Sequence, residues 1–315
     1  MQVTHGTVLP GGGRRGASPG TGLTIGNFDG VHLGHRAMLK RLVEKSRELR
    51  LPCSVLTFEP HPREFFSPAS APARLTRLRE KLELIAESGV DRVHVMRFDA
   101  RLAALTAARF IDDVLLDGLG MRWLLVGRDF RFGARRAGDY AVLQAAAARR
   151  GAHVEAMGDV MEGGQRVSSS SVRTSLAAGD MAGAARLLGR GYMMSGRVAH
   201  GEKLGRTLGF PTANIVLRRR PPLSGIFAVQ AELEETHAVV RGVASVGRRP
   251  TVKEHAAPLL EVHLFDWQGE LYGRHLRVNF LHKLRDEAKF EGLDALRAAI
   301  ARDAQQAREY FRKHG

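Results

Sequence analysis

Two histidines, His32 and His35, stand three residues apart in the stretch TIGNFDGVHLGH. Imidazole rings at this spacing bind metal ions or donate hydrogen bonds to the oxygens of a phosphate. Two such rings can also be exposed residues with no function. The chemistry therefore depends on the elements that hold the rings and on what else the chain supplies.

A strand-like run, 23–25, leads into this stretch, and a helical pattern, 36–49, follows it. If Gly34 begins the helix, both rings lie near its exposed N–H groups and the positive end of its dipole. Gly26 and Gly30 would let a phosphate approach the backbone closely. These features favour phosphate handling over the two other interpretations.

A zinc ion would need a third ligand, and His61, in the segment FEPHP, is the candidate. Nothing in the sequence fixes its distance from the histidine pair. The stretch VSSSSVRTSL instead adds hydroxyls and Arg173, which can bind two phosphate oxygens at once. A third polar loop, VGRDFRFG, follows another strand-like run. Three such loops favour a nucleotide site.

The first half of the chain alternates short apolar runs with amphipathic helical patterns. The runs SVLTF, RVHVM, WLLVG and HVEAM are separated by RLREKLELIAESGV, AARFIDDVLLDGLG and YAVLQAAAARRG. This alternation predicts a parallel sheet covered on both faces, in a doubly wound, Rossmann-like domain. Ligands of such folds bind at the carboxyl ends of the strands, where the histidine pair is expected. The glycine-rich GGGRRGASPG favours a flexible loop.

From about Tyr192 the pattern changes to six short runs with period-two character, which predict an antiparallel barrel. A helix is expected from about Leu293 to Phe311, with an apolar stripe that covers the open side of the barrel. Its stripe residues are Leu293, Leu296, Ile300 and Ala304. The boundary between the halves is predicted near Arg186, which gives domains at 1–186 and 187–315. The fold class is therefore α/β followed by all-β.

Composition bears on the location of the protein but does not decide its function. The chain of 315 residues has no apolar run long enough to span a membrane, and its single cysteine, Cys53, precedes an apolar run. We expect a buried, inert thiol and a cytoplasmic location. The net charge of +15 would suit nucleic acid, yet 40 of the 48 basic residues are arginine and scattered, so an anionic small molecule fits equally well.

These motifs together resemble a known family. GNFDGVHLGH, TFEPHP, VGRDFRFG and VSSSSVR are similar to the adenylyltransferase module of the bifunctional prokaryotic riboflavin kinase/FAD synthetases. GEKLGRTLGFPTANI, GIFAV, GVASVGRRPTV, LEVHLF and LYGRHLRVNFLHKLRDEAKF are similar to the riboflavin kinase module. The resemblance covers nearly the whole chain, and it implies a Rossmann-like domain followed by a six-stranded barrel.

For the first module, the resemblance implies that His32 and His35 bind the phosphates of ATP and stabilise charge during adenylyl transfer. The further ATP-binding or phosphate-binding residues that it implies are Gly26, Asn27, Asp29, Gly34, Ser168, Ser169 and Arg173. The flavin-binding residues that it implies here are Phe58, His61 and Asp129.

For the second module, the resemblance implies that Glu261 is the general base that takes the proton of the ribityl hydroxyl. Thr212 and Asn214 would position Mg²⁺ and the phosphates of ATP, and Arg285 would help to bind the flavin. Three glycines of a flap would cover the phosphates: Gly201, Gly205 and Gly209. From the residue types alone, the favoured interpretation is that Thr212 and Asn214 are ordinary strand and turn residues and Glu261 is an exposed strand carboxylate.

The chain departs from the family pattern at three serines. Ser245 stands where asparagine is usual, and Ser170 and Ser171 stand where threonine and a variable, often basic, residue are common. The expected reaction is ATP-dependent conversion of riboflavin to FMN and then of FMN to FAD, with Mg²⁺. The alternatives are a related nucleotidyltransferase with another phosphate substrate and a basic RNA-binding protein. We expect no nucleic-acid or membrane partner, and a homo-oligomer stays open.

Overall fold

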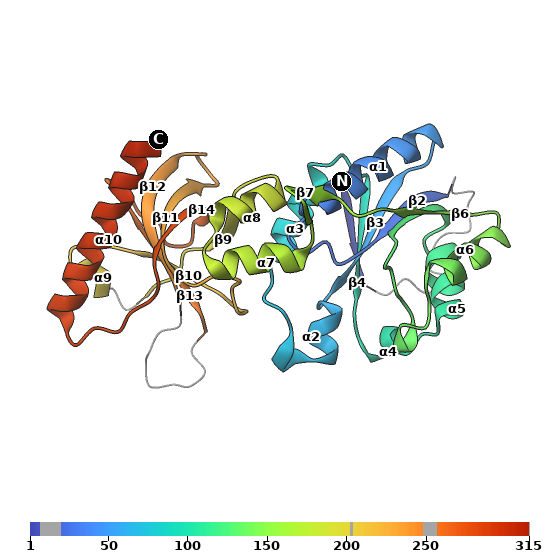
Figure 1. Cartoon of the computed structure of the whole chain (residues 1–315), viewed down its shortest axis with the longest axis horizontal. Helices are drawn as coiled ribbons and strands as arrows, with labels where there is room; N and C mark the ends of the chain where they lie inside the picture. The colour runs from blue at the N-terminus through green and yellow to red at the C-terminus, as the bar shows by residue number, and fades with distance from the viewer. Residues whose placement is uncertain (7–19, 202–203, 248–256, 315) are drawn as a thin grey trace. The chain divides into compact units, whose positions relative to one another are not determined.

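The computed structural model describes residues 1–6, 20–201, 204–247 and 257–314. By internal contacts the chain forms two compact units (Figure 1). The first contains Met1–Pro72 and Thr76–Val167, and the second contains Ala73–Leu75 and Ser168–Gly315. The predicted domain boundary at 186/187 stays a prediction. The expected flexible loop GGGRRGASPG lies, apart from Gly20, outside the described residues, as does the RRPTV part of GVASVGRRPTV.

The first unit is built on a six-stranded sheet in which all neighbouring strands are parallel. In the spatial order of the sheet, its strands are β1 (Gln2–His5), β4 (Arg92–Arg97), β3 (Cys53–Glu59), β2 (Thr21–Ile25), β5 (Met121–Gly127) and β6 (His153–Met157). From β2 the chain adds β3 and then β4 on one side of the sheet, and then β5 and β6 on the other side. The carboxyl end of β2 therefore lies at the switch point, where doubly wound sheets bind ligands. The Rossmann-like prediction is confirmed.

Helices cover both faces of this sheet, which explains why its strands are apolar on both sides. On one face α1 (Leu33–Glu48) and α3 (Leu78–Ala86) pack through Leu39, Leu42 and Ile85 against Val55 and Leu125. The other face is covered by α6 (Tyr140–Ala148) and the helical segment that contains Phe110–Leu116. The remaining short elements of the unit are α2 (Pro62–Phe66), Pro68–Ser70, α4 (Ala100–Ala103), α5 (Ala107–Arg109), Ala134–Arg136, β7 (Met161–Glu162) and β8 (Gln165–Arg166).

Cys53 is fully buried at the start of β3, as predicted. Burial raises the pKa of its thiol to about 11, because the thiolate would lose its hydration. The thiol lies 3.2 Å from Oδ2 of Asp91 and 3.8 Å from the backbone oxygen of Gly89. The thiol is therefore a structural group and not a nucleophile.

The second unit starts with α7 (Ser169–Ala178) and α8 (Met181–Leu188) and continues into six antiparallel strands. In spatial order the strands are β10 (Ala213–Val216), β13 (Leu259–Leu264), β12 (Val239–Gly247), β11 (Gly225–Leu233), β14 (His275–Arg285) and β9 (Tyr192–Arg197). The ends of this order meet where the N–H of Ala199 donates to the C=O of Asn214 at 2.7 Å. This bridge brings β9 and β10 together, and the six-stranded barrel is confirmed. The short helix α9 (Leu204–Thr207) lies between these two strands in sequence.

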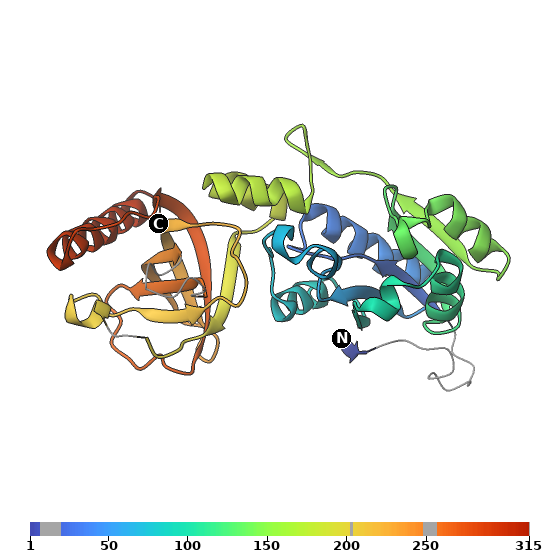
Figure 2. The same ribbon diagram turned by 90° about the horizontal axis from the view of Figure 1, so that it is seen from below.

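The last helix, α10 (Leu293–His314), packs on the outside of the strands (Figure 2). Its buried side chains Ala304, Ala307 and Phe311 contact the cluster of Ile226, Ala228, Val243 and Phe265. The predicted stripe is wrong at its first residue, because the side chain of Leu293 is 58% exposed. The packed part of α10 runs from Ala299 to Phe311, so the first turn adds little to the contact. No helix among the described residues is long and apolar enough to cross a membrane.

Candidate active sites

The turn from β2 to α1 holds the sequence motif in an unusual backbone conformation. We call residues 26–35 the histidine loop. Phe28 and Val31 adopt φ values of 49° and 39°, which non-glycine residues rarely do. The carboxylate of Asp29, which is 1% exposed, accepts hydrogen bonds from the N–H and hydroxyl of Thr76 at 3.1 and 3.3 Å. The N–H of Gly30 donates to the same hydroxyl at 3.0 Å. Asp29 thus fixes the shape of the loop.

His32 is the N-cap of α1 and His35 lies in its first turn. Nδ1 of His32 accepts the N–H of His35 at 3.3 Å, so the neutral ring of His32 carries its hydrogen on Nε2. The two rings stack with their centroids 3.7 Å apart, and the ring of Phe28 lies 5.0 Å from that of His35. A side chain at Gly34 would come within 3.2 Å of the His32 ring, so glycine permits this packing.

The environment of His35 disfavours its charged form. Burial, the neighbouring His32 and the ammonium group of Lys81 together hold the pKa of His35 well below its usual value, in that order of importance. Lys81, on α3, is only 1% exposed. Sequence reasoning missed this lysine because a helical lysine is normally solvated. The sequence signal that could have identified it was a lysine on an otherwise apolar face of the predicted helix.

Two of the predicted flavin-binding residues lie at the carboxyl end of β3. His61 is the buried N-cap of α2, and its Nδ1 accepts the N–H of Arg63 at 3.1 Å. Phe58 contacts the ring of Phe98 edge-on at 5.8 Å between centroids. Beside them the side chain of Phe66 is 64% exposed. Within the described part of the chain, no group of three His, Cys, Asp or Glu side chains could hold a metal ion.

Asp129 follows β5 and belongs to a surface ion pair. Its Oδ2 accepts a hydrogen bond from Arg166 at 2.9 Å, and Nε of the same arginine lies 2.9 Å from Asp159. The Asp129 side chain remains 74% exposed. Its carboxylate is therefore accessible from solvent beside the guanidinium of Arg166.

The serine-rich segment belongs to the second unit and opens α7. Ser168 is its N-cap, where its hydroxyl accepts the N–H of Ser171 at 3.1 Å and its own N–H donates to the Ser171 hydroxyl at 2.9 Å. Ser169 is the first helical residue. Nε of Arg173 donates to the C=O of Ala73 at 2.6 Å. These bonds order the start of α7, and the expected contacts with ATP stay predictions.

The barrel brings the candidate kinase residues into one row across neighbouring strands. Asn214 of β10 lies directly opposite Glu261 of β13, which lies opposite Ser245 of β12, which lies opposite Ile226 of β11. Opposite residues share a face of the sheet, and Ile226 packs in the α10 cluster. We call these four residues the strand row; it lies on the α10 side of the sheet.

Two of the flap glycines pack directly against the residues expected to hold Mg²⁺ and ATP. A side chain at Gly201 would come within 2.5 Å of the Asn214 amide, and one at Gly205 within 2.4 Å of the Phe210 carbonyl and 3.2 Å of the Thr212 hydroxyl. Gly209 has a φ of +87°, which favours glycine. Oδ1 of Asn214 is buried without a hydrogen-bond partner among the described residues. An oxygen in that state fits the preference of Mg²⁺ for oxygen ligands.

Arg285, at the end of β14, is held by the last helix. Its Nε and one terminal nitrogen donate to both carboxylate oxygens of Asp303 at 2.7 and 2.6 Å. Its other terminal nitrogen donates to the C=O of Asp286 at 2.8 Å, and the guanidinium lies 5.7 Å from the ring of Phe290. The predicted flavin contact is untested, and the visible role of Arg285 is to fix α10 to the barrel.

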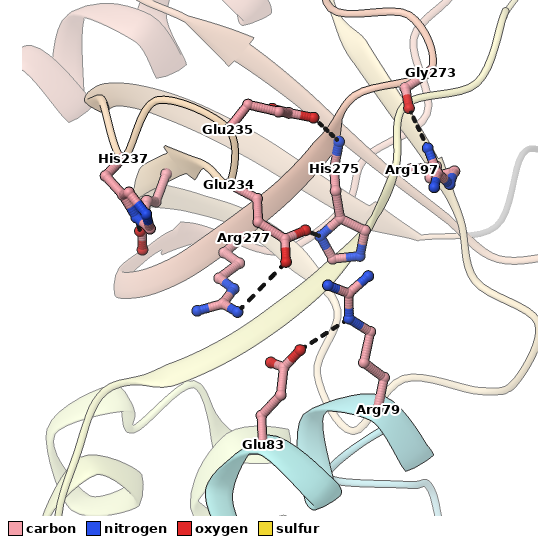
Figure 3. Close-up of polar contacts among 10 residues, drawn as sticks. Arg79, Glu83, Arg197, Glu234, Glu235, His237, Gly273, His275 and Arg277 are labelled. Atoms are coloured by element: carbon pink, nitrogen blue, oxygen red, sulfur yellow. Dashed lines mark hydrogen bonds and ion pairs between the residues drawn. The ribbon is translucent and has the colours of Figure 1, made fainter. Parts of the chain in front are cut away.

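A further polar cluster of the barrel lies at the other end of β11 from Ile226. Nδ1 of His275 lies 3.0 Å from Glu234, and Arg277 lies 3.9 Å from the same carboxylate (Figure 3). The N–H of His275 donates to Glu235 at 3.4 Å. These contacts join the β11–β12 turn to the start of β14, and sequence reasoning assigned them no role.

Comparison with known proteins supports the two-module interpretation. A family model described as FAD synthetase matches residues 15–171, and one described as riboflavin kinase matches residues 188–311. The structure is similar to a crystal structure described as a macrolide-efflux protein from Streptococcus pneumoniae. The two have a TM-score of 0.79 and 26% sequence identity, over 98% of this chain and 99% of that one.

Two curated relatives bear the same description, bifunctional riboflavin kinase/FMN adenylyltransferase. The protein of Escherichia coli K12 is 52% identical over 290 residues, which cover 92% of each chain. That of Pseudomonas fluorescens is 51% identical over 286 residues, 90% of this chain and 91% of the relative. Identity at this level over nearly the whole length shows that this chain belongs to the family of bifunctional riboflavin kinase/FMN adenylyltransferases.

Proposed function

We propose that this chain makes FAD in two steps, at two separate sites. The strand row phosphorylates riboflavin to FMN, and the histidine loop transfers the adenylyl group of ATP to FMN, releasing pyrophosphate. The observation that supports this proposal is that the two histidines lie together in the first unit, and Asn214 and Glu261 lie together in the second. His32 and His35 are stacked at a helix start, and Asn214 and Glu261 are directly opposite in neighbouring strands.

In the kinase step, Glu261 accepts the proton of the ribityl hydroxyl as the hydroxyl oxygen attacks the γ-phosphorus of ATP, and the bond to the departing ADP breaks. Asn214 and Thr212 hold the phosphates and Mg²⁺, and the missing side chains of Gly201 and Gly205 leave room beside them. When bound, Mg²⁺ neutralises charge on the transferring phosphoryl group. The need of buried Asn214 Oδ1 for a partner supports this role.

In the adenylyl step, an oxygen of the FMN phosphate attacks the α-phosphorus of ATP, and the bond to the departing pyrophosphate breaks. Nε2–H of His32 donates to the phosphate oxygens as negative charge develops on them, and the ring of His35 stands beside it. The positive end of the α1 dipole adds to this potential. Gly26 and Gly34 keep the backbone accessible, and Asp29 keeps the loop in shape.

Several roles extend this proposal to the remaining predicted residues. Phe58, His61 and Asp129 bind the flavin of the adenylyl step, and Ser168, Ser169 and Arg173 bind ATP or the flavin phosphate. Arg285 helps to bind the flavin of the kinase step, and Gly209 belongs to the flap that covers the phosphates. Asn27 contributes to the ATP pocket. The cytoplasmic location, the absence of nucleic-acid and membrane partners and the oligomeric state stay predictions.

Incubation of the full chain with riboflavin, ATP and Mg²⁺, followed by chromatography, tests the proposal. FMN should appear first and FAD should follow, and omission of Mg²⁺ should stop the first step. FMN without FAD, even when FMN is supplied, would favour a nucleotidyltransferase with another phosphate substrate. Formation of neither product, together with tight binding of RNA, would favour the RNA-binding alternative.

A further inference from the structure

Among the described residues of the first unit, Lys81 is the most deeply buried cation for which no function has been given above. It lies in the first turns of α3 and is 1% exposed. An ammonium group that leaves water loses several kcal/mol of hydration unless polar groups replace it. A lysine at an ordinary packing position would therefore be replaced by an apolar residue at no loss of stability. Its burial calls for a local explanation.

The amino group of Lys81 connects α3 to the histidine loop through one threonine. Nζ of Lys81 donates to the hydroxyl of Thr57 at 3.4 Å, and this hydroxyl donates to the C=O of Asn27 at 3.3 Å. Thr57 is itself fully buried near the carboxyl end of β3. The segment from Thr76 to Lys81 thus holds the loop at two points, at Asp29 through Thr76 and at Asn27 through Thr57.

The same ammonium group acts on His35 through space. The groups that lower the pKa of His35 are its own burial, then His32 on the same helix, then Lys81 from α3. Geometry supports the neutral form independently, because Nδ1 of His35 is buried with no hydrogen-bond partner among the described residues. A protonated ring would carry an N–H there, and an unpaired buried donor is costly.

We propose that Lys81 is a positioning residue for adenylyl transfer: it fixes the histidine loop through Thr57 and acts on the ring of His35 through its charge. This inference rests on the proposed function of the loop. With Lys81 in place, the stacked rings keep one orientation and His35 meets ATP uncharged. Their hydrogen bonds then strengthen as charge develops on the phosphates, which favours the transition state over bound substrate.

The direct test is a pH titration of the His35 ring by NMR in the full chain, with the signal assigned from His35→Gln. We expect the His35 pKa to rise in Lys81→Met, which removes the charge, and to stay near the parental value in Lys81→Arg. Lys40→Met is the matched control, because Lys40 lies on the same helix as His35 with its side chain 78% exposed. The ring signal of His94, in β4, reports whether the sheet remains folded.

The second test follows FAD formation from FMN against pH. In Lys81→Met the acidic limb of kcat/KM should move to higher pH, because a raised pKa lets His35 become protonated sooner as the pH falls. At the optimum the rate should fall roughly tenfold, less than the about 10²-fold that a 1 Å misplacement costs. Phosphorylation of riboflavin by the same molecules is the internal control and should be unchanged.

Thr57→Val separates the two parts of the proposal. It breaks the link to Asn27 while keeping the charge, so FAD formation should fall while the titration of His35 stays unchanged. The proposal is overturned if Lys81→Met, with the His94 signal retained, leaves the His35 titration at its parental position, or if Thr57→Val forms FAD at the parental rate. If Lys81→Met loses the His94 signal, the proposal is tested by the FAD formation of Thr57→Val and the His35 titration of Lys81→Arg instead. A parental chain that forms no FAD would instead count against the proposed function, and the titration would still judge the effect of Lys81 on His35.

Discussion

The histidine loop takes its proposed reactive groups from ten consecutive residues, whereas the strand row takes its four residues from four strands. A turn and a helix start are enough to bring His32 and His35 together. Asn214 and Glu261 meet only if β10 and β13 pair in the correct register. A shift of one residue would turn Glu261 to the opposite face of the sheet. The two reactions therefore depend on the fold in different ways.

The two regions also differ in how they treat charge. The histidine loop disfavours positive charge on the ring of His35 through burial, the neighbouring His32 and Lys81. On the barrel, the cation Arg285 is instead paired with both oxygens of the Asp303 carboxylate. A buried group that must bind a phosphate benefits from a fixed protonation state. A group that joins a helix to a sheet benefits from a complete ion pair.

Separating the two regions should produce the largest effect. A fragment of residues 187–315 should fold and convert riboflavin to FMN but form no FAD, since each region holds its own phosphate motifs. Residues 1–186 should convert supplied FMN to FAD. Product analysis of both fragments, with circular dichroism for folding, is the measurement. A folded 187–315 fragment without kinase activity would show that its site needs residues outside it, and 168–315, which keeps α7 and α8, is the comparison. FAD formed by 187–315 would overturn the role given to the histidines.

Glu261→Gln should abolish one reaction while leaving the other. Because a general base contributes about 10²–10⁴-fold, FMN formation should fall by that factor and FAD formation from FMN should stay near normal. The rates of FMN formation from riboflavin and of FAD formation from FMN are measured by chromatography. Glu232→Gln, which alters a carboxylate at the far end of β11 beside His237, is the control and should change neither. Equal losses in both reactions would point to a structural role for Glu261.

His32→Ala and His35→Ala should give the opposite selectivity. Each should lower FAD formation by about 10²–10³-fold, the typical loss for one preorganised donor, and leave riboflavin phosphorylation intact. The measurement is again the pair of rates, with His153→Ala, an exposed histidine of β6, as the control. Zinc found by elemental analysis in the parent and lost in both variants would contradict the phosphate role.

The smallest effect concerns stability, at the contact between β14 and α10. Asp303→Ala removes the partner of Arg285, whose side chain is 29% exposed, while Asp303 is 7% exposed. Loss of one partner of a buried pair costs 3–5 kcal/mol; partial exposure reduces this to about 1–3 kcal/mol. Urea unfolding followed at Trp267, in a Trp123→Phe background, measures it for the second unit. Glu291→Ala, at an exposed position before α10, should cost far less. An unchanged midpoint would mean that the ion pair does not hold the helix.

The sequence by itself determined the order and type of the main elements. Alternating apolar runs and helical patterns predicted the parallel sheet, because βαβ connections bury both faces of such a sheet. Period-two runs predicted the antiparallel barrel. The motif of His32 and His35 could be located at a strand-to-helix turn, since a turn and a helix start depend on neighbours within a few residues. The strand β1, four residues long and exposed, gave too weak a pattern to be predicted.

Only the tertiary structure decided which distant residues act together. No local pattern could tell that Lys81 reaches the histidine loop through Thr57, because the two lie on a helix and a strand that meet only after packing. The face that α10 presents was also settled by packing: Ala304, Ala307 and Phe311 fit the sheet, and Leu293 stays exposed. Strand register likewise set Glu261 between Asn214 and Ser245, because hydrogen bonds between chain segments about 15 to 50 residues apart select one alignment among several with the same periodicity.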